Sequence, residues 1–164
     1  MNPEQWLSLK WNGGSTMSDR WLNQSKIIHR PKVECDDSEV MEVLEDLCGA
    51  MDRGTCSGPP PDEPPLDEIY IFDKYDIELI LKDLSIEDFV GKIKDVGKGA
   101  KKRIQRGYPQ EYLYVFQYAC ELKRRDFDDS GINKEKVLIY IKINNRKEPT
   151  RNVFVVSFHK NREN

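Results

Sequence analysis

The chain lacks the features that would assign it to a membrane or to a disulfide-bonded secreted framework. No apolar run approaches the roughly 20 residues that a membrane-spanning helix needs. The N-terminus carries no basic segment followed by a hydrophobic stretch, so no signal peptide is expected. The four cysteines show no paired spacing, which is typical of reduced thiols. We therefore expect a cytoplasmic protein that makes no membrane contact.

The motifs of the common hydrolases and nucleotide-binding enzymes are also missing. His29 and His159 are the only histidines and lie far apart in the sequence, which disfavours a two-histidine ribonuclease site. No P-loop, G-x-G-x-x-G or H-E-x-x-H motif occurs. Carboxylates are plentiful but scattered, and the spacing of the cysteines matches no common zinc pattern. We expect neither a metal nor a cofactor.

Charge is distributed unevenly along the 164 residues. Residues 1–68 carry 6 Lys and Arg against 14 Asp and Glu, whereas residues 69–164 carry 20 against 15. A proline-rich stretch at 57–66 favours extended backbone and predicts a linker. We expect an acidic N-terminal segment over 1–68 and an α+β domain over 69–164 that meets an anionic partner. Residues 12–17 can be encoded by a ribosome-binding sequence, so the natural start is predicted at Met17 of a bacterial protein.

The strongest secondary-structure signal lies at the C-terminal end. Residues 137–145 and 152–160 are rich in β-branched and aromatic residues and flank a polar loop, which predicts an antiparallel strand pair. Alternation places a uniformly apolar set on the face expected to meet a core, namely Val137, Ile139, Ile141 and Ile143. The opposite face mixes a phenol, an ammonium and an amide, from Tyr140, Lys142 and Asn144. Such a face suits a small enzyme, a nucleic-acid binder or any half-exposed sheet.

The remaining elements complete an α+β pattern. Residues 112–122 predict a third strand, with a helix as the alternative. On the strand face that Gln117 shares with Leu113, Val115 and Ala119, it is the one polar residue. Helices are expected over 36–52 and 77–84, and a short strand over 69–72. A further helix is expected from about residue 86 to Val96, with one apolar side formed by Ile86, Phe89, Val90 and Ile93. The predicted architecture is two or three helices packed on a twisted antiparallel sheet.

A dense basic run marks residues 90–106, where Asp95 is the only acid. The cations there favour phosphate binding, with a solvated loop as the alternative: Lys92, Lys94, Lys98, Lys101, Lys102, Arg103 and Arg106. A basic and aromatic set remains as candidate chemistry, formed by Lys92, Gln117, Tyr140, Lys142, His159 and Lys160. Such a set can cut RNA without a metal, because a base, stabilising cations and an acid suffice for attack by the ribose 2′-hydroxyl.

From Asp76 onward the chain resembles the MqsR-type toxins, which are bacterial mRNA interferases related in fold to RelE. The resemblance is carried by L-S-I-E-D-F at 84–89, F-Q at 116–117, Y-I-K-I at 140–143 and V-V-S-F-H-K at 155–160. It implies a RelE-like fold and a metal-independent endoribonuclease. Such an enzyme would cut mRNA at short sequences, on the ribosome or on free transcripts, and would be inhibited by a cognate antitoxin.

By position, the resemblance implies catalytic roles for Lys92, Gln117, Tyr140 and a basic residue after Phe158. That basic residue is His159, where the family has lysine, or Lys160. RNA binding is expected from the basic set Lys98, Lys101, Lys102, Arg103, Arg106 and Lys142. Two departures stand out: Gly91 occupies the expected lysine position, and the acidic N-terminal segment has no counterpart. The alternative is a non-catalytic phage or mobile-element protein that binds a host protein or RNA, which would need neither Gln117 nor Tyr140.

Overall fold

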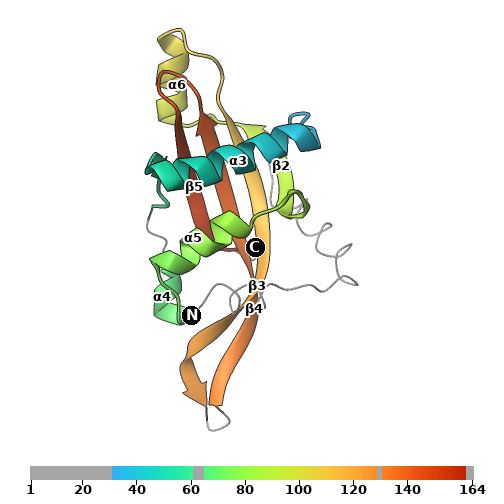
Figure 1. The fold of residues 1–164 in the computed structure, drawn as a ribbon, viewed down its shortest axis with the longest axis vertical. Helices are drawn as coiled ribbons and strands as arrows, with labels where there is room; N and C mark the ends of the chain where they lie inside the picture. The colour runs from blue at the N-terminus through green and yellow to red at the C-terminus, as the bar shows by residue number, and fades with distance from the viewer. Residues whose placement is uncertain (1–30, 61–64, 129–130, 162–164) are drawn as a thin grey trace.

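The computed structural model describes residues 31–60, 65–128 and 131–161, which form one sheet with helices across one side (Figure 1). In chain order the elements are α3 (Asp37–Arg53), β1 (Cys56–Ser57), α4 (Leu66–Ile69), α5 (Lys74–Asp83), β2 (Phe89–Lys94), α6 (Lys98–Gln105), β3 (Tyr112–Asp128), β4 (Gly131–Arg146) and β5 (Asn152–Lys160). The expected α+β class is confirmed. Met17, His29 and residues 61–64 of the proline-rich stretch lie outside the described residues. No helix in the described part is long and apolar enough to cross a membrane.

The sheet has the order β1-β5-β4-β3-β2 and is mixed. Strands β2, β3, β4 and β5 pair antiparallel, which confirms the predicted pairing of the two C-terminal runs. The two-residue strand β1 runs parallel to β5, so the expectation of an entirely antiparallel sheet was wrong at this edge. The parallel pair forms because the chain leaving α3 passes beside β5, where the Val153 N–H donates to the Thr55 carbonyl at 3.2 Å.

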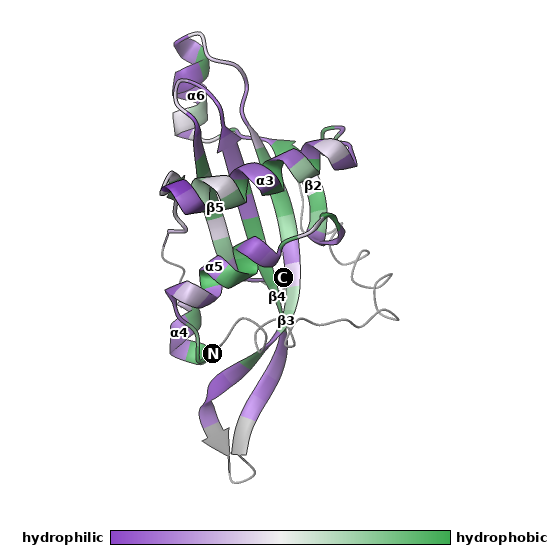
Figure 2. Ribbon diagram, viewed as in Figure 1, coloured by the Kyte–Doolittle hydropathy of each residue, from purple (hydrophilic) through white to green (hydrophobic). Residues whose placement is uncertain are grey.

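The main core lies between the sheet and helices α3 and α5, on what we call the front face (Figures 1 and 2). The alternation predicted for β4 is confirmed, since its apolar set is fully or almost fully buried there: Val137, Ile139, Ile141 and Ile143. Hydrogen bonds also join helices α3 and α5 to this face. The Tyr118 hydroxyl donates to Asp83 of α5 at 2.6 Å, and the Tyr114 hydroxyl donates to Glu39 of α3 at 2.9 Å.

Helix α3 confirms the predicted helix in the acidic segment. The Asp36 carboxylate accepts from the Glu39 N–H at 2.9 Å, and Gly54 ends the helix at a φ of 75°, where a side chain would be strained. The stripe buried against the sheet is Val40, Val43, Leu44, Leu47 and Ala50. Because α3 and β1 share the core and sheet of the later elements, the described part of the 57–66 stretch does not separate two cores.

Two sequence-based assignments between residues 66 and 96 were wrong. Residues 66–69 form α4, and the strand expected at 69–72 is reduced to an isolated bridge between Tyr70 and Arg124. The helix expected from residue 86 is a single 3-10 turn, Ile86–Asp88, followed by strand β2. The apolar residues at 86, 89, 90 and 93 fit both periods. Pairing with β3 decides in favour of the strand, and Gly91 disfavours a helix.

The opposite side of the sheet, here the back face, carries a second and smaller apolar cluster. It comprises Val90, Ile93, Leu113, Val115 and Tyr140. These residues come from β2, β3 and β4 and alternate with the front-face residues of the same strands. The back face also holds four members of the basic and aromatic set that the sequence singled out, namely Gln117, Tyr140, Lys142 and His159.

Candidate functional site

Three of the predicted catalytic residues form one row across the back face. The register pairs Gln117 of β3 with Tyr140 of β4, and Tyr140 with His159 of β5. Side chains of directly paired residues lie on the same face of a sheet, so the three side chains are neighbours although they are up to 42 positions apart in the sequence. We call Gln117, Tyr140 and His159 the back-face row.

The row has close ring contacts and an adjacent cation. The rings of Tyr140 and His159 lie 5.3 Å apart between centroids at an angle of 38°. The Lys142 ammonium lies 5.4 Å from the centre of the Tyr140 ring. Lys142 pairs with Val115 and Ser157, in the position beside the row. A phenol and an ammonium of β4 thus lie next to an imidazole of β5.

The tautomer of His159 follows from its contact with the backbone. Its Nδ1 lies 2.9 Å from the Lys160 carbonyl oxygen. A carbonyl oxygen only accepts hydrogen bonds, so this contact requires a proton on Nδ1. In the neutral ring, Nε2 is then left as the acceptor.

The other two members of the row are buried. Gln117 is 1% exposed and Tyr140 is 8% exposed, whereas His159 and Lys142 are partly exposed. Neither the amide oxygen nor the amide nitrogen of Gln117 has a hydrogen-bond partner, and in the described part of the chain these are the only buried side-chain polar atoms in that state. Leaving a buried amide unpaired costs about 1–3 kcal/mol, so Gln117 lowers the stability of the fold.

Lys92, the fourth residue implied by the resemblance, lies on the front face. A register irregularity falls between Phe89 and Gly91, after which Gly91 pairs with Val115 on the back and Lys92 pairs with Tyr114 on the front. A shift of one residue in a strand moves a side chain to the other face, so the displacement noted in the sequence removes Lys92 from the row. The ammonium is instead 2.7 Å from the Glu39 carboxylate and 4.3 Å from the Tyr112 ring centre.

The contact between Lys92 and Glu39 is part of a network that joins α3 to the sheet. Burial alone would raise the pKa of Glu39, but hydrogen bonds from Lys92, Tyr114 and Cys35 outweigh burial and hold this pKa below its ordinary value. Burial also raises the pKa of the Cys35 thiol to about 12, with hydrogen bonding to Glu39 as a further cause. Cys35 is therefore not a nucleophile at neutral pH.

Lys160 also lies away from the row. It follows His159, and its ammonium is 3.4 Å from the Glu135 carboxylate and 5.8 Å from the Tyr70 ring centre. Hydrogen bonding to Tyr70 and the charge of Glu135 raise the pKa of Lys160. A raised pKa keeps the ammonium charged, which suits an ion pair and not a base.

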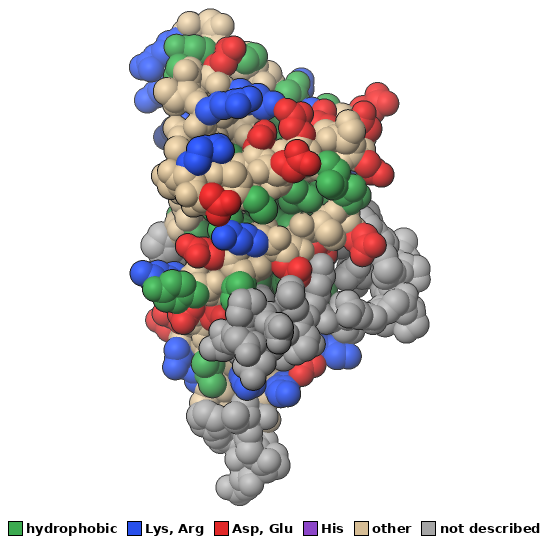
Figure 3. Space-filling model, in the orientation of Figure 1, with side chains coloured by type: hydrophobic (Ala, Val, Ile, Leu, Met, Phe, Trp, Pro, Cys, Tyr) green, Lys and Arg blue, Asp and Glu red, His purple; other side chains and the backbone are tan. Residues whose placement is uncertain are grey.

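The basic run occupies a separate part of the molecule. Lys98, Lys101 and Lys102 are exposed on α6, and Arg106 is exposed at its end, at the upper end of the sheet in Figure 1. The space-filling view shows cations gathered there and acidic side chains gathered over α3 (Figure 3). Arg103, on the same helix, forms an ion pair with Glu111.

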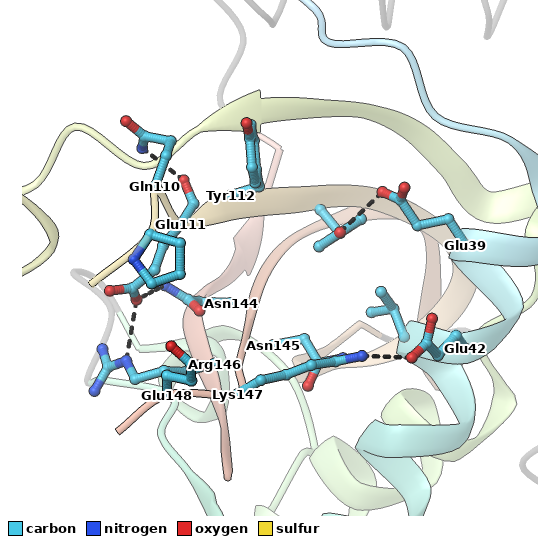
Figure 4. Close-up of a pocket in the computed structure, with 13 residues that line it drawn as sticks. Glu39, Glu42, Gln110, Glu111, Tyr112, Asn144, Asn145, Arg146, Lys147 and Glu148 are labelled. Atoms are coloured by element: carbon cyan, nitrogen blue, oxygen red, sulfur yellow. Dashed lines mark hydrogen bonds and ion pairs between the residues drawn. The ribbon is translucent and has the colours of Figure 1, made fainter. Parts of the chain in front are cut away.

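A cleft of about 340 Å³ opens on the front side between α3, the start of β3 and the end of β4 (Figure 4). Several of its charged groups are paired with one another or with neighbouring residues. Glu111 accepts hydrogen bonds from Asn144 at 2.9 Å, Arg146 at 3.0 Å and Arg103 at 3.1 Å. Lys147 forms an ion pair with Glu42. Since these contacts join three parts of the chain, we assign the cleft residues a structural role.

Neither a metal site nor similarity to known proteins assigns a function to this chain. Among the described residues, no group of three His, Cys, Asp or Glu side chains is arranged to hold a metal ion. No protein-family model, curated protein or solved structure gave a significant match to this chain.

One residue near the site was not foreseen from the sequence. Lys32 lies beside β2, and its side-chain carbons contact Gly91 on the back face. The signal that could have pointed to it is the glycine itself. A glycine inside a strand often marks close approach by another part of the chain.

Proposed function

We propose that this protein is the toxin of a toxin–antitoxin pair and cuts mRNA with its back-face row, in a RelE-like domain. The observation that carries the proposal is the register. It places Gln117, Tyr140 and His159 side by side from three separate strands. These are three of the residues for which the resemblance to MqsR-type toxins implies a role in cleavage.

The chemistry assigned to the row is attack of a ribose 2′-hydroxyl on the adjacent phosphate. His159 Nε2 is placed as the base that takes the hydroxyl proton, since Nδ1 is engaged by the Lys160 carbonyl. Lys142 supplies positive charge to the phosphorane, and the Tyr140 hydroxyl donates a proton or hydrogen bond to the leaving 5′-oxygen. Gln117 orients the nucleotide. The bond to the 5′-oxygen breaks, which yields a 2′,3′-cyclic phosphate and a 5′-hydroxyl.

Lys92 and Lys160, which lie on the front face, have a structural role and take no part in cleavage. Lys92 and Lys160 hold carboxylates at 2.7 and 3.4 Å, and both ion pairs belong to contacts that stabilise the fold. The exposed cations of α6 extend the phosphate-binding surface beyond the row. The acidic helix α3 lies on the front, so it does not cover the row, and its exposed carboxylates offer a surface for a basic antitoxin segment.

Burial of Gln117 and Tyr140 favours a second candidate function. Side chains that are 1% and 8% exposed do not meet RNA unless the back face opens. A non-catalytic phage or mobile-element protein, binding a host protein or RNA, requires no such opening. The two candidates differ in whether the row is needed for a cellular effect.

The experiment is tightly controlled induction in a bacterial host, with growth recorded and new mRNA 5′ ends mapped. Tyr140→Phe and His159→Ala should abolish growth arrest and the new ends, whereas Lys92→Ala should retain both. Wild-type protein should be tested alongside a chain that begins at Met17. Normal growth and intact mRNA from both well-expressed chains would eliminate the interferase and leave the binding protein.

A further inference from the structure

Strand β2 presents no side chain on the back face at Gly91. The register places Gly91 opposite Val115, next to the apolar cluster that includes Val90, Ile93 and Tyr140. A Cβ built on Gly91 would lie 3.0, 3.2 and 3.3 Å from the Cδ, Cε and Cγ atoms of Lys32. These distances are too short for comfortable contact, so the aliphatic part of Lys32 occupies the space that any other residue at position 91 would fill.

The backbone around Lys32 is fixed on that side of the sheet. The Val33 N–H donates to the Lys92 carbonyl at 2.7 Å, and the two residues form an antiparallel bridge. Val33 and Lys92 therefore share the front side of the sheet. Because neighbouring residues of an extended chain point to opposite faces, Lys32 lies on the back, on the same side as Gly91. The bridge and the carbon contacts agree on this position.

We propose that Lys32 is a phosphate-binding residue of the back-face site, acting with Lys142. This inference rests on the proposed function, and it adds a substrate-binding residue from outside the 76–160 region. Lys142 pairs with Val115, and Val115 pairs with Gly91, so the two lysines flank Val115. Strands lie about 4.8 Å apart, which puts the positions 91 and 142 roughly 10 Å apart across the sheet.

The geometry suits an RNA strand that crosses the sheet. A backbone running from β2 towards β4 would meet the exposed Lys32 first, then Lys142, and would reach Tyr140 and His159 in the adjoining row. Contact of its carbons with Gly91 restricts the Lys32 side chain, so less conformational entropy is lost when its ammonium binds a phosphate. A lysine can also pack its stem on apolar surface with no ligand in view, and the test must separate these two roles.

The test uses a fluorescent single-stranded 2′-O-methyl RNA of mixed sequence, which cannot be cut because the nucleophilic hydroxyl is blocked. Binding to the full-length protein is measured by anisotropy over a range of salt concentrations. Lys32→Met keeps the stem but removes the charge, and should weaken binding several-fold. For this variant, the slope of log affinity against log salt concentration should become less steep by about 0.7, which is the contribution of one phosphate contact on a single strand. Lys32→Arg should bind like wild type.

Two further variants sharpen the outcome. Lys74→Met removes an exposed lysine from α5 on the front side and should leave both affinity and salt dependence unchanged. The double variant Lys32→Ala, Gly91→Lys vacates the space above position 91 and places a cation there, so it should recover binding lost in Lys32→Ala alone. Recovery would show that the charge on this side of β2 matters, not the identity of residue 32.

The results that would refute the role of Lys32 differ from those that would refute the proposed function. Wild-type protein that binds RNA and a Lys32→Met protein with the same affinity and salt slope would refute the role of Lys32 and leave the proposed function standing. Equal losses in Lys32→Arg and Lys32→Met would refute it as well, since the stem would then matter more than the charge. Wild-type protein that neither binds this RNA nor cuts unmodified RNA would overturn the proposed function and this inference together.

Discussion

Replacing Gln117 by methionine should make the protein more stable and inactive. Gln117 is 1% exposed, and its amide lacks any hydrogen-bond partner. Methionine has nearly the same size and shape and leaves no buried polar atom unsatisfied. The expected gain is about 1–3 kcal/mol in the free energy of unfolding, which is the usual cost of an unpaired buried amide. For a chain of this size the melting temperature should rise by roughly 2–4 °C per kcal/mol.

Asn144 provides the matched control, because it is a second buried amide on the same sheet. It is 2% exposed, but its nitrogen donates to Asp95 at 3.0 Å and to Glu111 at 2.9 Å. Asn144→Leu removes two charge-assisted hydrogen bonds and should destabilise the fold by about 2–4 kcal/mol. The two substitutions are alike in chemistry and opposite in expected sign.

Urea unfolding of the two variants and wild type, followed by circular dichroism, gives the free energies. RNA cleavage by the same preparations gives the activity. A Gln117→Met protein that is less stable than wild type would refute the reasoning, because its amide would then be making a stabilising contact. A stabilised variant that retains full activity would refute the functional role assigned to Gln117.

Two further predictions concern the charged networks. Lys92→Ala leaves Glu39 without its cation, so unfolding in urea should show a loss of about 1–3 kcal/mol, while RNA cleavage should stay near the wild-type rate. Hydrogen bonds from Arg103, Asn144 and Arg146 outweigh burial and lower the pKa of Glu111 in the folded protein. The resulting stabilisation is fully present above about pH 4.3, the unfolded value, and is lost as the pH falls through the lowered folded pKa. Between pH 7 and pH 3, the free energy of unfolding measured with urea should therefore fall less for Glu111→Gln than for wild type. An equal fall in both proteins would contradict a lowered pKa of Glu111 in the folded state.

The C-terminal strands could be predicted because their signal is local and redundant. Alternation in β4 gives both the strand and its buried face, with Ile139 and Ile141 fully buried. Caps and an apolar stripe likewise define α3. Strand β1 could not be predicted, since two residues, Cys56 and Ser57, carry no period and their pairing depends on where the chain passes β5.

The site was predictable only in part, for a reason that lies in β2. Tyr140, Gln117 and His159 each sit in a regular strand, so register alone brings them together. Lys92 was assigned to the same site, but the irregularity between Phe89 and Gly91 decides which face it takes. Gly91 is the only trace of this irregularity in the sequence, and it could not be interpreted because residues 86–96 were expected to form a helix and not a strand.

Cleavage of a defined mRNA by purified protein in the presence of EDTA is the measurement that decides the role of the back-face row. Wild-type protein should produce fragments that end in a 2′,3′-cyclic phosphate and begin with a 5′-hydroxyl. Tyr140→Phe and His159→Ala should be folded and at least 100-fold slower, on the order of the effect of one general acid or base. Cleavage that persists at the wild-type rate in both variants, or fragments with 3′-hydroxyl ends, would contradict the assignment of catalysis to this row.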